Sequence, residues 1–561
     1  MRIVERAFAE ADRRALLESG VHPVLARIYA GRRIRTSGEL SYQASALFAP
    51  NLLKNIEPAA CLLADAIAAG KRMLIVADYD ADGATACAVG LRALRAFGAQ
   101  VDYLVPDRFK LGYGLSPELV ELAAQRKPDL LITVDNGIAS VEGVARAHSL
   151  GIATLITDHH LPGPELPSAA CIVNPNQPGC GFPSKALAGV GVMFYVVLAT
   201  RAQLRRRGFF EGRTEPNLGS LTDLVALGTV ADVVPLDANN RNLVSQGLKR
   251  IRAGRAQPGV SALLRAAGRS VAEATSFELG FVAGPRLNAA GRLADMSVGI
   301  ECLATDDEAR AMNLALELDR LNTERRAIEA SMLEQALNLI KNVKEQNRLT
   351  FFDPAWHQGV VGILAARLKD RVHRPVICFA PAQESGQAVL RGSGRSIPGL
   401  HLRDCLDLVA KRAPGLIARF GGHAMAAGLS ILETHYPSFA KTFEDSVEEL
   451  LPAEARLRTV ETDGALDAAH CTLEVARMLE GEIWGQGFPQ PVFCDNFAVE
   501  AQQVVGQRHL KLRLAKDGRR YEAMRFGALD PLPDRVRAAY RLAVNEFNGL
   551  RSIQLNVEHF E

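Results

Sequence analysis

Acidic, amide and histidine side chains follow three apolar runs of this 561-residue sequence, directly after each run ends. They are Asp78, Asp80 and Asp82 after 73–77, Asp135 and Asn136 after 130–134, and Asp158, His159 and His160 after 153–157. A further acid, Asp232, lies within the apolar stretch 224–236. Carboxylates and imidazoles without cysteine suit Mn²⁺ or Mg²⁺ better than a structural Zn²⁺. The residue types therefore indicate a metal site.

Helix capping is the competing explanation for these acids. Asp is a preferred residue at the start of a helix, and capping alone would account for Asp82, which precedes a helical pattern. It does not account for three acids in one turn together with two adjacent histidines after another run. Carboxylates gathered in one place raise one another's pKa and cost stability unless a cation lies between them. We therefore favour the metal site.

The number of candidate ligands is sufficient for two divalent ions rather than one. Such ions lie about 3.5–4 Å apart and share a bridging carboxylate. A pair of this kind activates water and clamps a phosphoryl oxygen, so the chemistry it serves best is phosphoester hydrolysis.

These acids belong to a regular alternation of short apolar runs and helical patterns. Strand-like runs occur at 73–77, 101–105, 130–134 and 153–157, with helical patterns between them at 84–98, 116–125 and 140–151. Strands that alternate with helices of this length predict right-handed βαβ units and a parallel sheet. The carboxyl ends of parallel strands share one edge, where ligands bind, so the acids and histidines should converge there.

Four of these stretches also resemble the motifs of a known family, in the same order. "DYDADG", "VDNGI", "TDHH" and "ALGTVADVVPL" look like the four motifs of the DHH phosphoesterase superfamily. More narrowly, the sequence resembles the RecJ family, bacterial exonucleases that degrade single-stranded DNA 5′→3′. The similarity also covers "LAGVGVMFY", "GPRLNAAGRL", "HQGVVGILAARL", "GSGRS" and "FGGHAMAAGLS".

The resemblance implies a role for each candidate site residue. Two ions would be held by Asp80, Asp82, Asp135, His159 and Asp232, with Asp135 as the bridge between them. His160 would face the scissile phosphate and stabilise the charge that develops on its oxygens. Asp78 would either bind a metal ion or support a ligand. Asp158 would orient the histidine pair, as carboxylates often do for imidazoles at metal sites.

Polar residues after Asp232 are candidates for binding substrate. Arg286, Asn288 and Arg292 stand among small residues in "GPRLNAAGRL". Small residues permit close approach of the backbone, and an arginine fork can hold a phosphate, with a solvated turn as the alternative. The resemblance implies that Arg108 and Arg286 contact the 5′-terminal phosphate of the substrate.

A second α/β unit is predicted at 346–450, after one long helical pattern at 305–343 that links two lobes. "RGSGRS" and "GGHAMAAG" are interpreted as Gly-rich loops whose backbone N–H groups face an anion, with Ser393 and Arg395 completing a phosphate pocket. In the family this unit is the DHH-associated domain, and its Ser-x-Arg pattern helps to hold the 5′ phosphate. His423 would line the same substrate cleft.

The sequence from about residue 455 changes to short alternating strands, which predicts an OB-like barrel. Basic residues cluster at 507–520, so Lys511, Arg513 and Tyr521 are candidates for tracking and stacking a single strand. On the sequence alone a solvated face is an equally good explanation. The family has an OB domain at this place, which favours strand binding.

The expected fold is α/β, with several domains because 561 residues exceed the usual size of one core. The domains are an N-terminal helical extension (1–45), a DHH catalytic domain with a parallel sheet (46–304), a connecting helix (305–345), a second α/β or DHH-associated domain (346–452) and an OB-like barrel (453–561). A net charge of +2 neither requires nor excludes a polyanionic partner.

Cysteine usage and hydropathy predict a cytoplasmic protein with no membrane partner. The nine cysteines are scattered and never spaced C-x-x-C, which excludes a zinc knuckle and disfavours a disulfide frame. The N-terminal residues are charged and lack the apolar core of a signal peptide, and the apolar stretch 189–199 is too short to span a bilayer.

The leading hypothesis is a metal-dependent exonuclease that degrades single-stranded DNA 5′→3′ to mononucleotides in recombination and repair. Expected partners are single-stranded DNA, a single-strand-binding protein and a helicase, and the protein is expected to be a monomer. One alternative is a DHH-family phosphodiesterase for short oligonucleotides or cyclic dinucleotides, which would not need the strand-rich C-terminal domain. The other is an inactive nucleic-acid-binding scaffold, which would have lost metal ligands.

Overall fold

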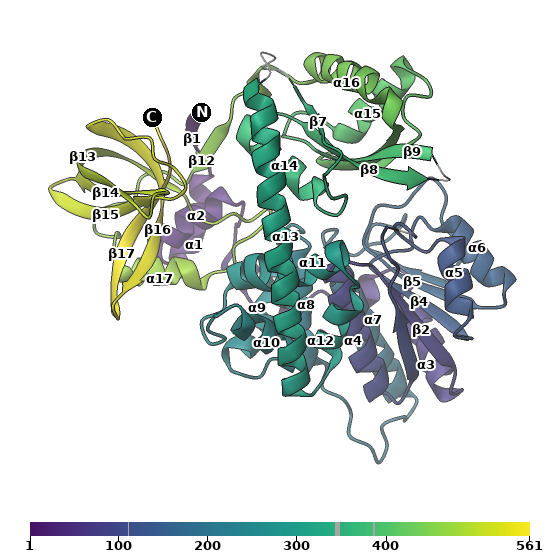
Figure 1. Ribbon diagram of the computed structural model, residues 1–561. Coiled ribbons are helices and arrows are strands. Elements are labelled where there is room, and N and C mark those ends of the chain that lie inside the picture. Colours follow the sequence, from purple (N-terminus) through teal and green to yellow (C-terminus); the bar gives the residue numbers. More distant parts are fainter. Residues whose placement is uncertain (110, 343–347, 385–386) are drawn as a thin grey trace. The chain divides into compact units, whose positions relative to one another are not determined.

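The computed structural model describes residues 1–109, 111–342, 348–384 and 387–561 (Figure 1). The described residues form two compact units. The larger unit comprises Glu5–Asn322 and Thr462–Glu561, and the smaller unit comprises Met1–Val4 and Thr323–Glu461. The acid-rich segments therefore lie in the larger unit, and the two Gly-rich segments lie in the smaller one.

A five-stranded parallel sheet forms the centre of the acid-rich part of the larger unit (Figure 1). Its strands, in the spatial order β3-β2-β4-β5-β6, are β2 (Arg72–Ala77), β3 (Gln100–Leu104), β4 (Leu130–Val134), β5 (Ala153–Thr157) and β6 (Cys171–Val173). The central strands are buried on both faces, as in sheets with helices on each side. The predicted parallel sheet is confirmed, and it has one further strand, β6.

Helices cover both faces of this sheet. Met73, Ile75 and Ala77 of β2 belong to one hydrophobic core, and Leu74 and Val76 belong to another. The first core includes α3 (Ile56–Ala68), α4 (Ala81–Ala96) and α7 (Gly189–Arg206), and the second includes α5 (Pro117–Ala124) and α6 (Val141–Ser149). Within the described part of the chain, no helix is both long and apolar enough to cross a membrane.

A group of helices follows the sheet and carries the remaining acid. These helices are α8 (Thr222–Ala231), α9 (Ala238–Arg252), α10 (Pro258–Ala266), α11 (Gly284–Leu293) and α12 (Ser297–Ala304). The stretch 284–293 is thus helix α11 and not a solvated turn. A π-helical segment, η5 (Glu278–Ala283), precedes it. Pro285 accounts for the wider turn, because proline has no N–H to donate and its ring clashes with the carbonyl four residues earlier.

The smaller unit contains most of the long helix and a mixed sheet. Helix α13 (Glu308–Asn342) is continuous, and residues 343–345 of the expected connecting helix lie outside the described residues. The sheet strands, in the order β10-β11-β9-β8-β7, are β7 (Thr350–Phe352), β8 (Val376–Glu384), β9 (Gln387–Arg395), β10 (Arg419–Gly422) and β11 (Ala426–Leu432). The helices are α14 (Val361–Val372), α15 (Leu402–Arg412) and α16 (Tyr436–Leu450).

The Gly-rich segments of this unit lie mostly in strands, so their interpretation as loops is wrong except for the turn 423–425. "RGSGR" belongs to β9, which pairs with β8 on one side and β11 on the other. The glycines serve packing here, since an added Cβ would lie 2.5 Å from Phe379 Cε1 at Gly392 and 2.8 Å from Leu402 Cδ2 at Gly394. "GGHAMAAG" lies in the antiparallel hairpin of β10 and β11. Hydrogen bonds between the strands occupy N–H groups that a loop could have offered to an anion.

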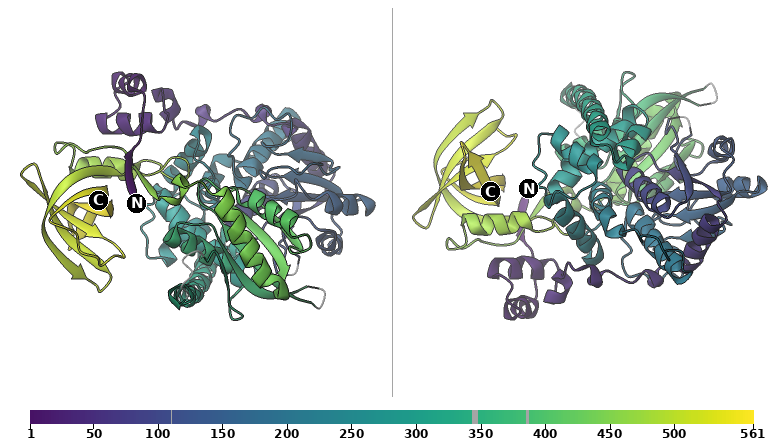
Figure 2. Two further views of the ribbon diagram at one scale, coloured as in Figure 1. Left: turned by 90° about the horizontal axis from the view of Figure 1, so that it is seen from above. Right: turned by 90° about the horizontal axis from the view of Figure 1, so that it is seen from below.

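The C-terminal part of the larger unit is a closed five-stranded barrel, as predicted (Figure 2). In the order β13-β14-β15-β17-β16, its strands are β13 (Phe493–Val505), β14 (His509–Lys516), β15 (Arg519–Arg525), β16 (Arg535–Phe547) and β17 (Leu550–Phe560), preceded by α17 (Leu473–Gly481). The N-terminal extension is not purely helical, because strand β1 (Arg2–Glu5) precedes α1 (Glu10–Glu18) and α2 (Pro23–Gly31) and pairs with β12 (Thr459–Thr462).

Candidate metal centre

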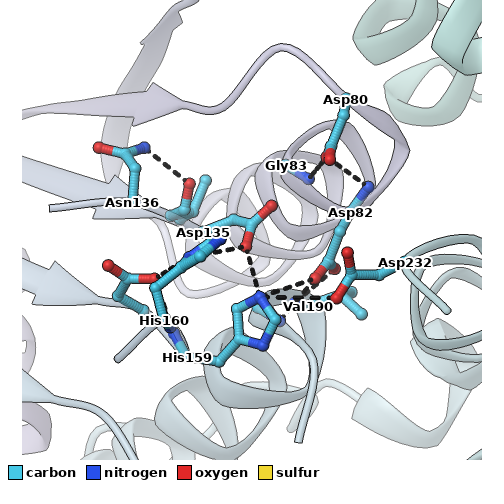
Figure 3. Close-up of polar contacts among 12 residues, drawn as sticks. Asp80, Asp82, Gly83, Asp135, Asn136, His159, His160, Val190 and Asp232 are labelled. Carbon is cyan, nitrogen blue, oxygen red and sulfur yellow. Dashed lines mark hydrogen bonds and ion pairs between the residues drawn. The ribbon is translucent and has the colours of Figure 1, made fainter. Parts of the chain in front are cut away.

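The predicted acids and histidines come together at the carboxyl edge of the parallel sheet (Figure 3). Ligand atoms within 4.8 Å of one another form three overlapping groups, which are Asp78 with Asp80 and Asp135, Asp135 with His159 and His160, and Asp82 with His159 and Asp232. Most of these residues follow strands β2, β4 and β5 or begin helix α4. Asp232 comes instead from the C-terminal end of helix α8.

Three carboxylates surround one imidazole nitrogen. His159 Nε2 lies 3.1 Å from Asp135 Oδ1, 3.5 Å from Asp232 Oδ2 and 3.9 Å from Asp82 Oδ2 (Figure 3). Within the described residues, His159 Nε2, Asp135 Oδ1 and Asp78 Oδ1 are buried and have no hydrogen-bond partner. Buried polar atoms are nearly always satisfied in proteins, so these three atoms call for a ligand.

The carboxylates are buried and repel one another, which raises their pKa values and favours a bound cation. Burial and then the charge of Asp80 raise the pKa of Asp82 to about 7. Burial, followed by neighbouring acids, raises the pKa values of Asp78, Asp135 and Asp232 well above their ordinary range. A divalent cation would remove both the repulsion and the cost of burial, so the donor set fits Mn²⁺ or Mg²⁺.

The two adjacent histidines are in different states. Burial and then the neighbouring His160 lower the pKa of His159 to about 4, so its imidazole is neutral and its lone pair is available to a metal. Burial acts against protonation of His160 as well. However, its hydrogen bond to Asp158, 2.8 Å from Nδ1 to Oδ1, and the charge of that carboxylate raise the pKa of His160 to about 9. His160 is therefore more readily protonated than His159.

Helix capping occurs at this site, but at Asp80. Its Oδ1 accepts hydrogen bonds from the N–H groups of Asp82 and Gly83 at the start of α4. Asp82, which seemed suited to cap that helix, accepts instead from Gly189 and Val190 at the start of α7, at 2.7 and 2.8 Å. Each acid thus fixes a helix terminus and also belongs to a metal-ligand group.

The backbone at Asp135 is adapted to the position of its carboxylate. Its φ of +64° lies in the left-handed region, which Asp tolerates better than most residues. The carboxylate lies against the start of α7, because a Cβ added to Gly189 would be 2.6 Å from Asp135 Oδ1. Asn136 Nδ2 donates to the carbonyls of Val76 and Val134, which joins the ends of β2 and β4.

Helix α11 packs against the loop 78–80 between β2 and α4, which carries Asp78 and Asp80. Asn288 Oδ1 accepts a 2.9 Å hydrogen bond from Ala81 N, at the start of α4. A Cβ on Gly291 would lie 1.9 Å from Tyr79 O, so only glycine allows this approach. The Arg108 guanidinium stacks 4.6 Å from the centre of the Tyr79 ring. The predicted substrate-binding residues Asn288 and Arg108 therefore also hold this loop in place.

Arg286 already has a carboxylate partner in the same unit. Its Nη2 lies 2.6 Å from Asp319 Oδ1, and its Nη1 donates to Val282 O. A phosphate would therefore compete with Asp319 for this guanidinium.

Three supporting residues were not identified from the sequence. The Tyr113 hydroxyl lies 3.0 Å from His160 Nδ1 and donates to Asp135 O at 3.2 Å. Asn174 Nδ2 donates to His160 O, and Asn176 Nδ2 to His159 O. The two asparagines follow strand β6, so the rule that polar residues after a strand reach the site would have found them, had the short run 171–173 been identified as a strand.

Ser393 and Arg395 lie on one face of β9, against helix α14. Arg395 Nη1 donates to Ser393 Oγ at 3.0 Å. A Cβ added to Gly362, in the first turn of α14, would lie 2.9 Å from Ser393 Oγ and 3.1 Å from Arg395 Nη2. The N-terminal turn of a helix, a hydroxyl and a guanidinium together suit a phosphate. His423 follows β10 and is exposed, and its N–H donates to Ala426 O.

The barrel residues do not form the predicted stacking surface. Tyr521 is 6 % exposed and its ring packs edge-on against Phe497 within the barrel core, so its prediction as a base-stacking residue is wrong. Alternation along β15 turns it inward. Lys511 Nζ and Arg513 Nε lie 3.1 and 3.4 Å from the carboxylate of Glu522. These two cations are exposed and already paired.

Comparisons with known proteins agree with this architecture. Three family models match, described as the DHH family N-terminal domain at 72–229, the DHHA1 domain at 336–449 and the RecJ OB domain at 462–559. The single-stranded-DNA-specific exonuclease RecJ of Dickeya dadantii is 51 % identical over 97 % of this chain and 96 % of its own. The chain belongs to the RecJ family. Its members in solved structures share the fold described above.

Two solved RecJ structures from Thermus thermophilus are similar along the whole chain. The complex with Mn²⁺ has a TM-score of 0.83 and 30 % identity, and covers 100 % of this chain and 79 % of that one. The complex with Mg²⁺ has a TM-score of 0.77 and 29 % identity, with 100 % and 78 % coverage. That protein was thus solved with each of the two cations that the donor set fits here.

The residues expected from the RecJ resemblance fall into two sets in this structure. The acids and histidines, with Arg108, Arg286 and Asn288, lie in the larger unit. Ser393, Arg395 and His423 lie in the smaller unit.

Proposed function

We propose that this chain is a metal-dependent exonuclease that hydrolyses single-stranded DNA 5′→3′ to mononucleotides. The observation that carries the proposal is the set of three carboxylates around His159 Nε2, with buried ligand atoms that lack hydrogen-bond partners. The family relationship supports the substrate. An inactive scaffold is not favoured, because every expected acid and histidine is present, and nothing in the site favours a dinucleotide substrate.

Asp80, Asp82, Asp135, His159 and Asp232 would hold two Mn²⁺ or Mg²⁺ ions, with Asp78 as a further ligand or a support. Asp135 is the candidate for the shared ligand, because its carboxylate belongs to the group with Asp78 and Asp80 and also lies 3.1 Å from His159 Nε2. When bound, such ions activate water and neutralise charge on the phosphate that is attacked. The buried site and the fixed helix ends keep the ligands in place before substrate arrives.

His160 would act on the phosphate as a positive hydrogen-bond donor. Its hydrogen bond to Asp158 favours the protonated ring, and its side chain is 34 % exposed where that of His159 is 12 % exposed. A fixed cation aimed at the phosphate stabilises negative charge that grows on the nonbridging oxygens. Asp158 and Tyr113 would hold the ring in this orientation.

The 5′ polarity would come from binding of the terminal phosphate. Ser393, Arg395 and the first turn of α14 would bind that phosphate in the smaller unit, with His423 as a further contact. Arg108, Arg286 and Asn288 would contact the substrate from the larger unit. Arg286 would then exchange Asp319 for a phosphate oxygen. The five domain boundaries predicted from the sequence are part of this proposal.

The proposal extends to the barrel, the partners and the location of the enzyme. Lys511 and Arg513 on the barrel would track the strand. A cytoplasmic monomer working behind a helicase, beside a single-strand-binding protein, in recombination and repair would meet such strands.

The test uses single- and double-stranded DNA labelled at either end, incubated with Mn²⁺, Mg²⁺ or chelator. We expect mononucleotides from the 5′ end of single strands with either metal, and none with chelator. Activity in chelator would overturn the metal assignment, and release from the 3′ end would overturn the polarity. Faster turnover of dinucleotides than of long strands would overturn the substrate class.

A further inference from the structure

Two phenylalanines stand exposed on the surface of the larger unit. Phe277 is 52 % exposed and Phe281 73 % exposed. Their rings stack on each other, with centroids 5.1 Å apart and planes 22° from parallel. Exposing two adjoining aromatic rings to water costs free energy that a ligand covering them would recover.

Two unusual backbone features occur in η5 and at the end of α8. Phe281 lies in the π-helical segment η5, and such turns are rare and occur often at functional sites. Val233, the residue after Asp232, is 62 % exposed and has φ +61°. A β-branched residue in the left-handed region is strained, and such strain clusters at functional sites.

The segment that carries the pair packs on the helix end next to the metal centre. A Cβ added to Gly280 would lie 3.0 Å from Val230 Cγ1, and one added to Gly284 would lie 2.9 Å from Ala231 Cβ. Ala231 directly precedes Asp232, so η5 packs on the turn of α8 that supplies this acid.

The other side of the same segment is attached to the C-terminal part of the unit. Ser276 Oγ donates a 2.7 Å hydrogen bond to Trp484 O, ahead of the barrel. Arg551, on barrel strand β17, lies 3.2 Å from Glu273 Oε1 through its Nη2. Residues 273–284 therefore join the end of α8 at the metal centre to the barrel.

We infer that Phe277 and Phe281 form a stacking platform for nucleobases of single-stranded DNA, on the segment that joins the metal centre to the barrel. The inference rests on the proposed function and adds a base-contacting surface to it. DNA is favoured over a protein partner because the segment packs on the end of α8 that supplies Asp232 and also contacts residues of the barrel part, so a strand leading from the metal centre to the barrel would pass it. Every base has a flat π face, so stacking on aromatic rings suits an enzyme that must accept any sequence.

The experiment measures binding in chelator, so that no strand is cut. Fluorescence anisotropy compares a 5′-phosphorylated oligothymidylate with a strand of equal length whose interior nucleotides are abasic. The double variant Phe277→Ala/Phe281→Ala should bind the intact strand about tenfold or more weakly, as expected for lost base–aromatic stacking. The abasic strand should bind this variant and the wild type equally.

Two further variants separate stacking from other causes. Phe277→Tyr/Phe281→Tyr keeps both rings and should bind the intact strand like the wild type. Leu122→Ala removes an apolar side chain on α5 that is 40 % exposed, and it should leave binding unchanged.

Wild-type affinity of the double alanine variant for the intact strand would overturn the platform. An equal loss on the abasic strand would overturn it too, since the loss would not depend on bases. Failure of the proposed function is distinguishable from both, because the wild type would then release no nucleotides from single strands in Mn²⁺.

Discussion

The metal centre and the basic strands of the barrel both gather charge, but they differ in how the charge is compensated. Asp82 and Asp135 are 0 % and 1 % exposed, and they share their site with further acids. Lys511, Arg513 and Glu522 of the barrel are about half exposed and form ion pairs. Buried charge of one sign requires a ligand, whereas an exposed pair is already satisfied. Compensation, rather than the number of charges, therefore distinguishes a binding site from a solvated face.

The largest effect is expected from removing the charge of Asp135, the acid that belongs to two ligand groups. Asp135→Asn should lower exonuclease turnover by about 10³-fold or more, because the variant loses a charged ligand at the phosphate. Its unfolding midpoint in chelator should not fall, since the lost charge is opposed by burial and by Asp82. Turnover with Mn²⁺ and urea unfolding in chelator measure the two effects.

The matched control is Asp65→Asn, which removes a carboxylate whose side chain is 68 % exposed and paired with Arg207. It should change neither turnover nor the unfolding midpoint by a measurable amount. Full activity of Asp135→Asn would contradict the metal assignment.

Asp82 differs from Asp135 because its carboxylate accepts hydrogen bonds from two backbone N–H groups. Asp82→Ala should abolish turnover as Asp135→Asn does, but it should also lower the free energy of unfolding by about 2 kcal/mol. The reason is that the buried N–H groups of Gly189 and Val190 lose their acceptor. Urea unfolding of the two variants in chelator checks the difference, and equal stability would show that these hydrogen bonds contribute little.

The sequence was sufficient to predict the strands that carry the site. The runs 130–134 and 153–157 coincide with β4 and β5, because a strand buried on both faces is apolar throughout and ends where its polar residues begin. The convergence of Asp135 and the two histidines then follows from the topology of a parallel sheet.

The sequence was not sufficient where one residue type has two physical uses. Gly392 and Gly394 resemble loop residues, but they give Phe379 and Leu402 room in a strand. Tyr521 resembles a base-stacking residue, but strand alternation turns it into the barrel core. Asp80, and not Asp82, caps α4, because the acid that faces the helix start depends on where the chain turns. These choices depend on neighbours that are distant in sequence.

A smaller effect is expected in the smaller unit. Arg395→Ala should weaken binding of 5′-phosphorylated strands by roughly tenfold, the value of a charge-assisted hydrogen bond. Binding of 5′-hydroxyl strands should change much less, because the guanidinium then has no terminal phosphate to hold. Anisotropy with the two strands in chelator measures the ratio, and equal losses on both would contradict a terminal-phosphate pocket.

The smallest effect on DNA affinity is expected on the barrel, where one substitution should weaken binding and another should strengthen it. Lys511→Ala should weaken single-strand binding by about threefold or less, because its charge is shared with Glu522 and screened by solvent. Glu522→Gln should strengthen binding by a similar factor, since it releases both Lys511 and Arg513 toward the phosphates. Both changes should shrink at high salt, as expected for phosphate contacts. Anisotropy at low and high salt tests this pair. A loss of a hundredfold for Lys511→Ala would show that the barrel binds DNA at this residue despite its ion pair, and that exposed, paired charge can form a site.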